Sequence, residues 1–102
     1  MSCGVDCGVS YNSDLEKVES ITIDVAKKVV KEYPGAVRDF KPFIRYKEFG
    51  DSNINFSVIM RIKEFKDQYV LKHEFIKALK KRFDKEGIEI AFPCTNVYIR
   101  KS

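Results

Sequence analysis

The stretch Lys47-Glu48-Phe49-Gly50-Asp51-Ser52-Asn53-Ile54-Asn55-Phe56 decides the fold of this chain. It places a polar turn, Gly50-Asp51-Ser52, between two runs that alternate in polarity, which is typical of a β-hairpin. After the turn, one face of the second strand carries Ile54, Phe56, Val58, Met60 and Ile62. The opposite face carries Asn53, Asn55, Ser57, Ile59, Arg61 and Lys63. This period of two predicts the central strand of a small sheet, because a helix repeats about every 3.6 residues.

The residues before the hairpin predict a strand followed by a helix. The segment Cys3–Tyr11 alternates and places Cys3, Val5, Cys7, Val9 and Tyr11 on one face. Ser13 and Glu16 have the spacing of a capping box, which predicts a helix that runs to about Tyr33. The apolar stripe of this helix is Leu15, Val18, Ile21, Val25, Val29 and Tyr33. Pro34-Gly35 ends it, since proline cannot continue the hydrogen-bond ladder and glycine accepts a left-handed backbone.

The residues after the hairpin predict a second helix and a last strand. The helix spans Asp67 to Glu86, with an apolar stripe of Leu71, Phe75, Ala78, Leu79 and Phe83. Gly87 is placed to end it, with Ile88 packing back behind. A linker through Pro93 then leads to a strand over Thr95–Arg100.

These elements define the predicted fold class. Together with a strand over Phe43–Phe49, the order is strand, helix, strand, strand, helix, strand. This order is that of an α+β, ferredoxin-like βαββαβ sandwich, with a four-stranded antiparallel sheet and both helices on one face. Each strand–helix–strand crossover should be right-handed. The expected sheet of this fold places the first and third strands at the centre and the second and fourth at the edges.

Length and composition point to one globular domain over residues 1–102. Apolar residues make up 44% of the chain and charged residues 33%, a balance that argues against disorder. The longest unbroken aliphatic run is Val58-Ile59-Met60, whereas crossing a bilayer needs about 20 apolar residues. A secretory signal pattern is also missing, so we expect a soluble, intracellular chain.

The charge and cysteine patterns favour no particular ligand. The net charge is +4, and lysines alternate with acids as in Lys80-Lys81-Arg82-Phe83-Asp84-Lys85-Glu86, which favours a solvated helix face over a nucleic-acid or lipid patch. Cys3 and Cys7 are separated by roughly 13 Å along a strand, too far for a disulfide or a shared metal. With Cys94 the cysteine count is odd, so we expect buried thiols in a reducing compartment.

We find no residues that predict catalysis, a cofactor or a metal site. His73 is the only histidine, and Lys77 stands where the zinc-protease helix motif needs a second one, so His73 is interpreted as a helix-surface residue. The expected open sheet face carries no aromatic ring on its two central strands, which argues against RNA binding by base stacking. The same face offers no convergent acid, base and nucleophile, so an enzyme is not predicted.

Several stretches, taken in order, resemble one family. They are Val9-Ser10-Tyr11, Asp14-Leu15-Glu16-Lys17-Val18, Val25-Ala26-Lys27, the segment from Lys47 to Phe56, Gly87-Ile88-Glu89-Ile90 and Phe92-Pro93. The set is similar to the carboxy-terminal cytoplasmic α/β domain of small-conductance mechanosensitive channels, the MscS family, from about Val5 to Lys101. The chain departs from that family at Ala91, where a proline is usual, and at Cys94 and Thr95, where a glutamine and a basic residue are usual.

The resemblance implies a subunit of a homo-heptameric channel in a prokaryotic inner membrane that opens under tension during hypo-osmotic shock. In that family the α/β domains form the wall of a cytoplasmic cage through which ions and small solutes pass. We therefore expect an excised domain without the membrane part, with no catalysis and no cofactor. The alternative is a freestanding ferredoxin-like module that binds a small ligand or metal ion and dimerises.

We expect the isolated chain to fold as a monomer or a weakly associated species, because the ring depends on segments that the chain lacks. Light scattering at tens of micromolar measures the mass directly. A stable heptamer formed by this chain alone would contradict the expectation.

Overall fold

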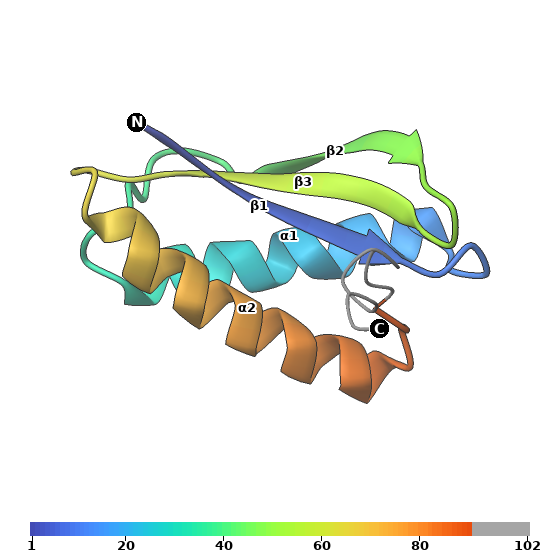
Figure 1. Ribbon diagram of the computed structural model, residues 1–102. Coiled ribbons are helices and arrows are strands. Elements are labelled where there is room, and N and C mark those ends of the chain that lie inside the picture. Colours follow the sequence, from blue (N-terminus) through green and yellow to red (C-terminus); the bar gives the residue numbers. More distant parts are fainter. Residues whose placement is uncertain (91–102) are drawn as a thin grey trace, which may run out of the picture.

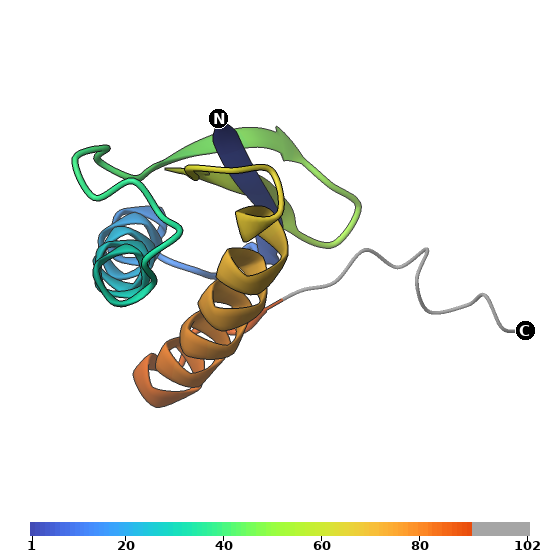
Figure 2. The same ribbon diagram turned by 90° about the vertical axis from the view of Figure 1, so that its left-hand side faces the viewer.

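The computed structural model of the protein describes residues 1–90 (Figure 1). In chain order the elements are β1 (Ser2–Val9), α1 (Leu15–Glu32), β2 (Phe43–Phe49), β3 (Ile54–Arg61) and α2 (Asp67–Glu86). Figures 1 and 2 show a sheet as one layer and both helices packed beneath it as the other. The α+β class and the two helices on one face of an antiparallel sheet are therefore confirmed.

The strand β3 lies between β1 and β2 and is antiparallel to both, as the hairpin stretch predicts. Val58 at its middle is opposite Val5 on one side and Ile44 on the other. The sheet has three strands within residues 1–90. The strand predicted over 95–100 lies outside the described residues, so the four-stranded ferredoxin-like sheet stays a prediction.

The hairpin turn buries a residue that the alternation places on the open face. Asn53 is only 3% exposed, and its carbonyl accepts a hydrogen bond from the Gly50 N–H (2.6 Å). The expected outward position of Asn53 is therefore wrong, because β3 begins at Ile54 and the strand period does not extend into the turn. A β-bulge between Tyr46 and Glu48 adds a second irregularity that the sequence pattern does not predict.

The first strand and the first helix meet in a different way from the prediction. β1 ends at Val9, and Tyr11 is exposed, with its ring stacked on Phe49 and its hydroxyl donating to the Gly50 carbonyl. The N-cap of α1 is Asp14 and not Ser13, since Asp14 Oδ1 accepts from the N–H groups of Glu16 (3.1 Å) and Lys17 (3.3 Å). A carboxylate at this position also suits the positive end of the helix dipole.

The second helix has the predicted bounds and both of its ends are hydrogen-bonded. Asp67 is buried at its start, accepts from the Glu64 N–H (2.9 Å) and accepts from the Tyr33 hydroxyl (3.1 Å). Gly87 ends the helix in the left-handed conformation at φ 75°, and the Ile88 N–H donates to the Phe83 carbonyl (2.9 Å). The predicted glycine end is confirmed, since a side chain is unfavourable at positive φ.

The core lies between the inner face of the sheet and the two helices. It contains the predicted alternation of β3, namely Ile54, Phe56, Val58, Met60 and Ile62, all buried. From the helices it receives Val18, Ile21, Val25, Ala26, Val29, Val30, Leu71, Phe75, Leu79 and Phe83. Leu15, Tyr33 and Ala78 from the predicted stripes are partly buried against this core.

The loop after α1 allows a direct test of packing with a matched control. A Cβ at Gly35 would lie 2.5 Å from Asp67 Cγ and 2.7 Å from Tyr33 Cε2, so Gly35→Ala has to displace the Tyr33–Asp67 contact. We expect a loss of about 1–3 kcal/mol in the free energy of unfolding, measured by urea denaturation.

Gly4→Ala is the control, because the nearest atom to its Cβ is Ile59 Cδ1 at an ordinary 3.6 Å. We expect its effect to stay within about 0.5 kcal/mol. Equal stability of the two variants would show that the Gly35 position tolerates a side chain.

Candidate functional site

A hollow in the described part of the chain follows the open edge of β1. β1 pairs only with β3 in the sheet, so its other backbone edge carries no strand within residues 1–90. At the end of this edge the Ser10 N–H donates to the Glu89 carbonyl (3.2 Å) and Val9 forms a single bridge with Ile90. A groove of about 570 Å³ lies here, with β1 and α2 as its two long sides.

The groove has an apolar side and a polar rim. The apolar side is made by Val5, Cys7, Ile76, Leu79, Phe83 and Ile90. The rim is made by Asp6, Lys47, Glu48, Asn55 and Lys80, which come from all three strands and from α2. Residues far apart in the sequence meet in it because β1 and β2 pair with the two edges of β3, while α2 packs against β1.

A cross-strand cluster centred on Asp6 fixes the polar rim. Asp6 is opposite Ser57, and its Oδ1 accepts from the Ser57 hydroxyl (2.6 Å) and from Lys47 Nζ (3.2 Å). The Ser57 hydrogen bond, and after it that of Lys47, lower the pKa of Asp6 below its ordinary value. Beside this pair, Asn55 Nδ2 donates to Glu48 Oε2 (3.1 Å). Each charge of this cluster thus already has a partner on the protein.

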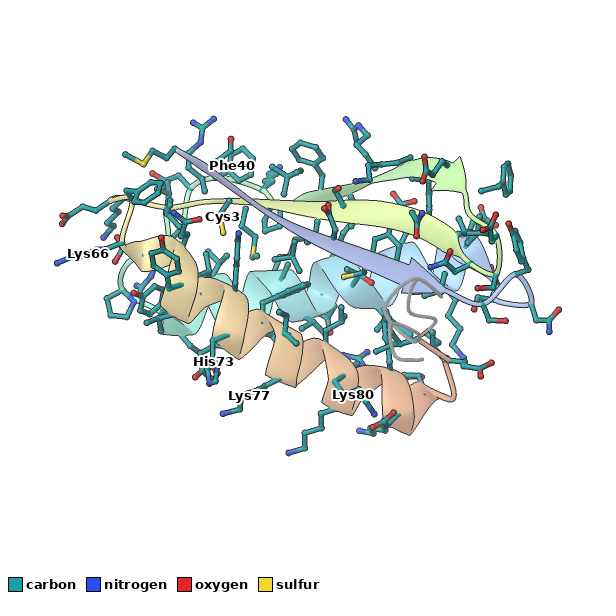
Figure 3. The ribbon with its side chains drawn as sticks, viewed as in Figure 1. Cys3, Phe40, Lys66, His73, Lys77 and Lys80 are labelled. Carbon is teal, nitrogen blue, oxygen red and sulfur yellow. The ribbon has the colours of Figure 1, made fainter. Side chains whose placement is uncertain are left out.

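The cysteines of β1 lie on its inner face and are unreactive by their environment. Cys3 is buried and Cys7 half-buried, both are free thiols, and Figure 3 shows Cys3 directed from β1 toward the helices. Burial, with the nearby Asp6 charge as a smaller cause, raises the pKa of Cys7 to about 12. Burial also raises the pKa of Cys3. Neither is a thiolate at neutral pH, which is the form needed for nucleophilic attack or metal binding. Cys94 lies outside the described residues.

The single histidine is remote from this groove. His73 projects from α2 away from the sheet, as Figure 3 shows, with its side chain 63% exposed. Its neighbour is Glu74 (Nε2 to Oε2, 3.8 Å), and Lys77 lies one turn further on. Within residues 1–90 no group of three His, Cys, Asp or Glu side chains is placed to hold a metal ion.

Comparison with known proteins identifies the family. Residues 4–90 match the family model described as "Mechanosensitive ion channel MscS, C-terminal". The chain belongs to the MscS family. The match includes α1, β2, β3 and α2 in full, β1 from residue 4 onward, and all the described lining residues of the groove at the β1 edge.

Curated relatives carry channel names. The chain is 30% identical over 96 residues to the small-conductance mechanosensitive channel MscMJ of Methanocaldococcus jannaschii, covering 92% of this chain and 27% of that one. It is 32% identical over 99 residues to the large-conductance channel MscMJLR of the same organism, with the same two coverages. A Helicobacter pylori small-conductance mechanosensitive channel is 31% identical over 97 residues, which are 92% of this chain and 33% of the relative. This chain thus spans about a quarter to a third of the length of these relatives.

Solved structures agree with the MscS assignment. The closed-state crystal structure of Helicobacter pylori MscS matches with a TM-score of 0.70 and 26% identity, over 100% of this chain and 39% of that one. The wild-type AtMSL1 structure matches at a TM-score of 0.63 and 14% identity, over 89% of this chain and 32% of that one, which supports the fold alone. In the described part of the present chain, neither helix has the length and apolarity needed to cross a membrane.

The Asp6 cluster generates a pH prediction. Because the folded pKa of Asp6 is lowered, its ionised form stabilises the fold above its unfolded pKa of about 3.9, and this contribution is lost as the pH falls through the folded pKa. Ser57→Ala and Lys47→Gln should each raise the pKa of Asp6, since each variant removes a hydrogen bond that lowers it. NMR titration of the Asp6 carboxyl carbon measures this pKa in the wild type and in both variants.

Ser20→Ala on the exposed face of α1 is the matched serine control and should leave the titration of Asp6 unchanged. An Asp6 pKa that is the same in wild type and Ser57→Ala would show that the cross-strand hydrogen bond is absent in solution.

Proposed function

We propose that this chain forms part of the wall of the cytoplasmic cage of a mechanosensitive channel. The observation that carries the proposal is the family match over residues 4–90 to the MscS C-terminal domain. In this proposal seven copies assemble as one homo-oligomer around the path of ions and small solutes. The channel opens under membrane tension and releases solutes during osmotic downshock, while the pore itself belongs to membrane helices outside this chain. The chain acts as one domain on the cytoplasmic side of a prokaryotic inner membrane.

The packing of the two layers supports a structural role. Two polar contacts join the helices. Tyr33 bonds Asp67 where α1 ends and α2 begins, and Arg82 Nη1 near the end of α2 bonds Asp24 Oδ2 (2.8 Å) at the middle of α1. Arg82 Nε also bonds Glu86 Oε2 (3.0 Å), which fixes the guanidinium between two helices. A unit that lies beside a flow of solute has to keep its shape, and contacts of this kind resist the sliding of α1 against α2.

The chemistry of the described groups supports passage without reaction. Lys80–Asp84 and Lys28–Asp24 pair within single helices, and Lys47–Asp6 pairs across strands. The two described thiols are protonated at neutral pH, as their raised pKa values require. These features favour a surface that solutes contact weakly, and we propose that the domain catalyses no reaction.

A chimera tests the proposal. The segment of the MscMJ channel that aligns with this chain, 27% of that relative, is replaced by residues 1–102. We expect the chimera to assemble at the same mass as the parent and to pass current under suction in patch-clamp recordings. It should also protect channel-deficient cells from hypo-osmotic shock.

The matched control is the same chimera with Phe56→Asp, which puts a charge at a fully buried position and should abolish assembly and current together. A chimera whose inserted domain is folded but whose subunits remain single would contradict a role in the cage wall. So would normal assembly without tension-activated current.

A further inference from the structure

A second hollow of about 380 Å³ lies between α1 and the loop that leads to β2. Figure 2 shows this loop running beside the helix from its end to the start of β2. Five basic side chains line the hollow: Lys27, Lys28 and Lys31 from α1, and Arg38 and Lys41 from the loop. All five residues are exposed, so their charged ends reach solvent.

The charge of this basic hollow is not balanced by the protein. Among the described residues Asp24 is the only carboxylate in the lining, and it is already engaged by Arg82 Nη1 (2.8 Å) and Lys28 Nζ (3.3 Å). Within residues 1–90 no ion pair joins Lys27, Lys31, Arg38 or Lys41 to a carboxylate. Lys27 and Lys31 are also four residues apart on one helix, a spacing at which like charges repel. The described lining of the hollow thus carries five cations and one carboxylate, which is already paired.

The walls of the hollow restrict what it can bind. Val30 and Pro42 are buried and form an apolar floor. Phe40 (labelled in Figure 3) also lines it, but the Arg61 guanidinium lies over its ring, 4.7 Å from the centroid, and Phe43 is its other ring neighbour at 6.0 Å. Arg61 thus covers one face of the Phe40 ring, which leaves less of the ring for base stacking, the usual means of binding single-stranded nucleic acid.

We propose that this basic hollow binds a compact multivalent phosphate anion of the di- and triphosphate class. Several cations around a small volume favour a ligand that carries several negative charges at short spacing, because each phosphate can meet a different cation. Inorganic polyphosphate and the phosphate chain of a nucleotide share this chemistry, and the site recognises the phosphates alone. The inference does not depend on the proposed channel role.

The test uses the 102-residue chain and sodium tripolyphosphate in about 50 mM salt, where charges are weakly screened. Calorimetry should give a dissociation constant below about 1 mM, weakened at least about fivefold when the salt is raised to about 300 mM. In amide NMR spectra the largest shifts should fall at residues 27–31 and 38–41. The dissociation constant of ATP should lie within about threefold of that of tripolyphosphate, and inorganic orthophosphate should bind at least about tenfold more weakly.

Two triple variants that each remove three positive charges distinguish binding at the basic hollow from a general effect of net charge. The site variant is Lys27→Gln, Lys31→Gln and Arg38→Gln, and it should lose at least about tenfold in affinity. The control variant is Lys66→Gln, Lys81→Gln and Lys85→Gln, which are exposed and belong to no ion pair of residues 1–90, and it should bind as the wild type does.

The proposal is overturned if both triple variants lose the same affinity for tripolyphosphate, or if the NMR shifts fall outside residues 27–31 and 38–41. It is also overturned if the wild type does not bind tripolyphosphate at 1 mM. It is also overturned if ATP binds more than about tenfold more tightly than tripolyphosphate, since a base would then be recognised. The proposal is overturned as well if a short single-stranded RNA binds and its NMR shifts fall in the groove at the β1 edge. The phosphates would then be bound at another surface.

Discussion

The structure depends on one strand that is constrained from every side. β3 is hydrogen-bonded to β1 and to β2 along its backbone, while Phe56, Val58 and Met60 are fully buried against the helices. A shift of β3 by one residue would expose these side chains and bury Ser57 and Asn55 in their place. The register of the sheet, the position of both helices and the open edge of β1 all follow from this strand.

Polar contacts then fix how the two helices lie against each other. Asp67 receives the Tyr33 hydroxyl at the start of α2, and the Arg82 guanidinium reaches Asp24 on α1. The Arg82 hydrogen bond, with that of Lys28 as the next cause, lowers the pKa of Asp24. Apolar packing alone leaves a helix pair free to slide, whereas these bonds have fixed partners and fixed lengths. Such fixed contacts are what the proposed role in a cage wall would require.

Charged side chains are paired at the groove along β1, whereas most of those that line the basic hollow beside α1 are unpaired within residues 1–90. On the β1 edge, Asp6, Lys47, Glu48 and Asn55 satisfy one another around an apolar groove. Beside α1, three of its lysines and the loop cations Arg38 and Lys41 gather with Asp24 as the one carboxylate among the described lining residues. This difference is not visible in the composition, which shows only a mild excess of lysine and arginine.

The sequence by itself determined the order of the described elements, the inner face of β3, the bounds of α2 and its end at Gly87. These follow from local rules, since alternation, helical spacing and glycine conformation act over a few residues. The family was also recognisable from ordered short stretches. Only the tertiary structure decided that Asp14 and not Ser13 caps α1, that Asn53 is buried, and that Tyr11 lies outside the strand. It alone brought Lys27, Arg38 and Lys41 together, because a surface site depends on distances between segments, and those are set by how α1 and the loop pack and not by spacing along the chain.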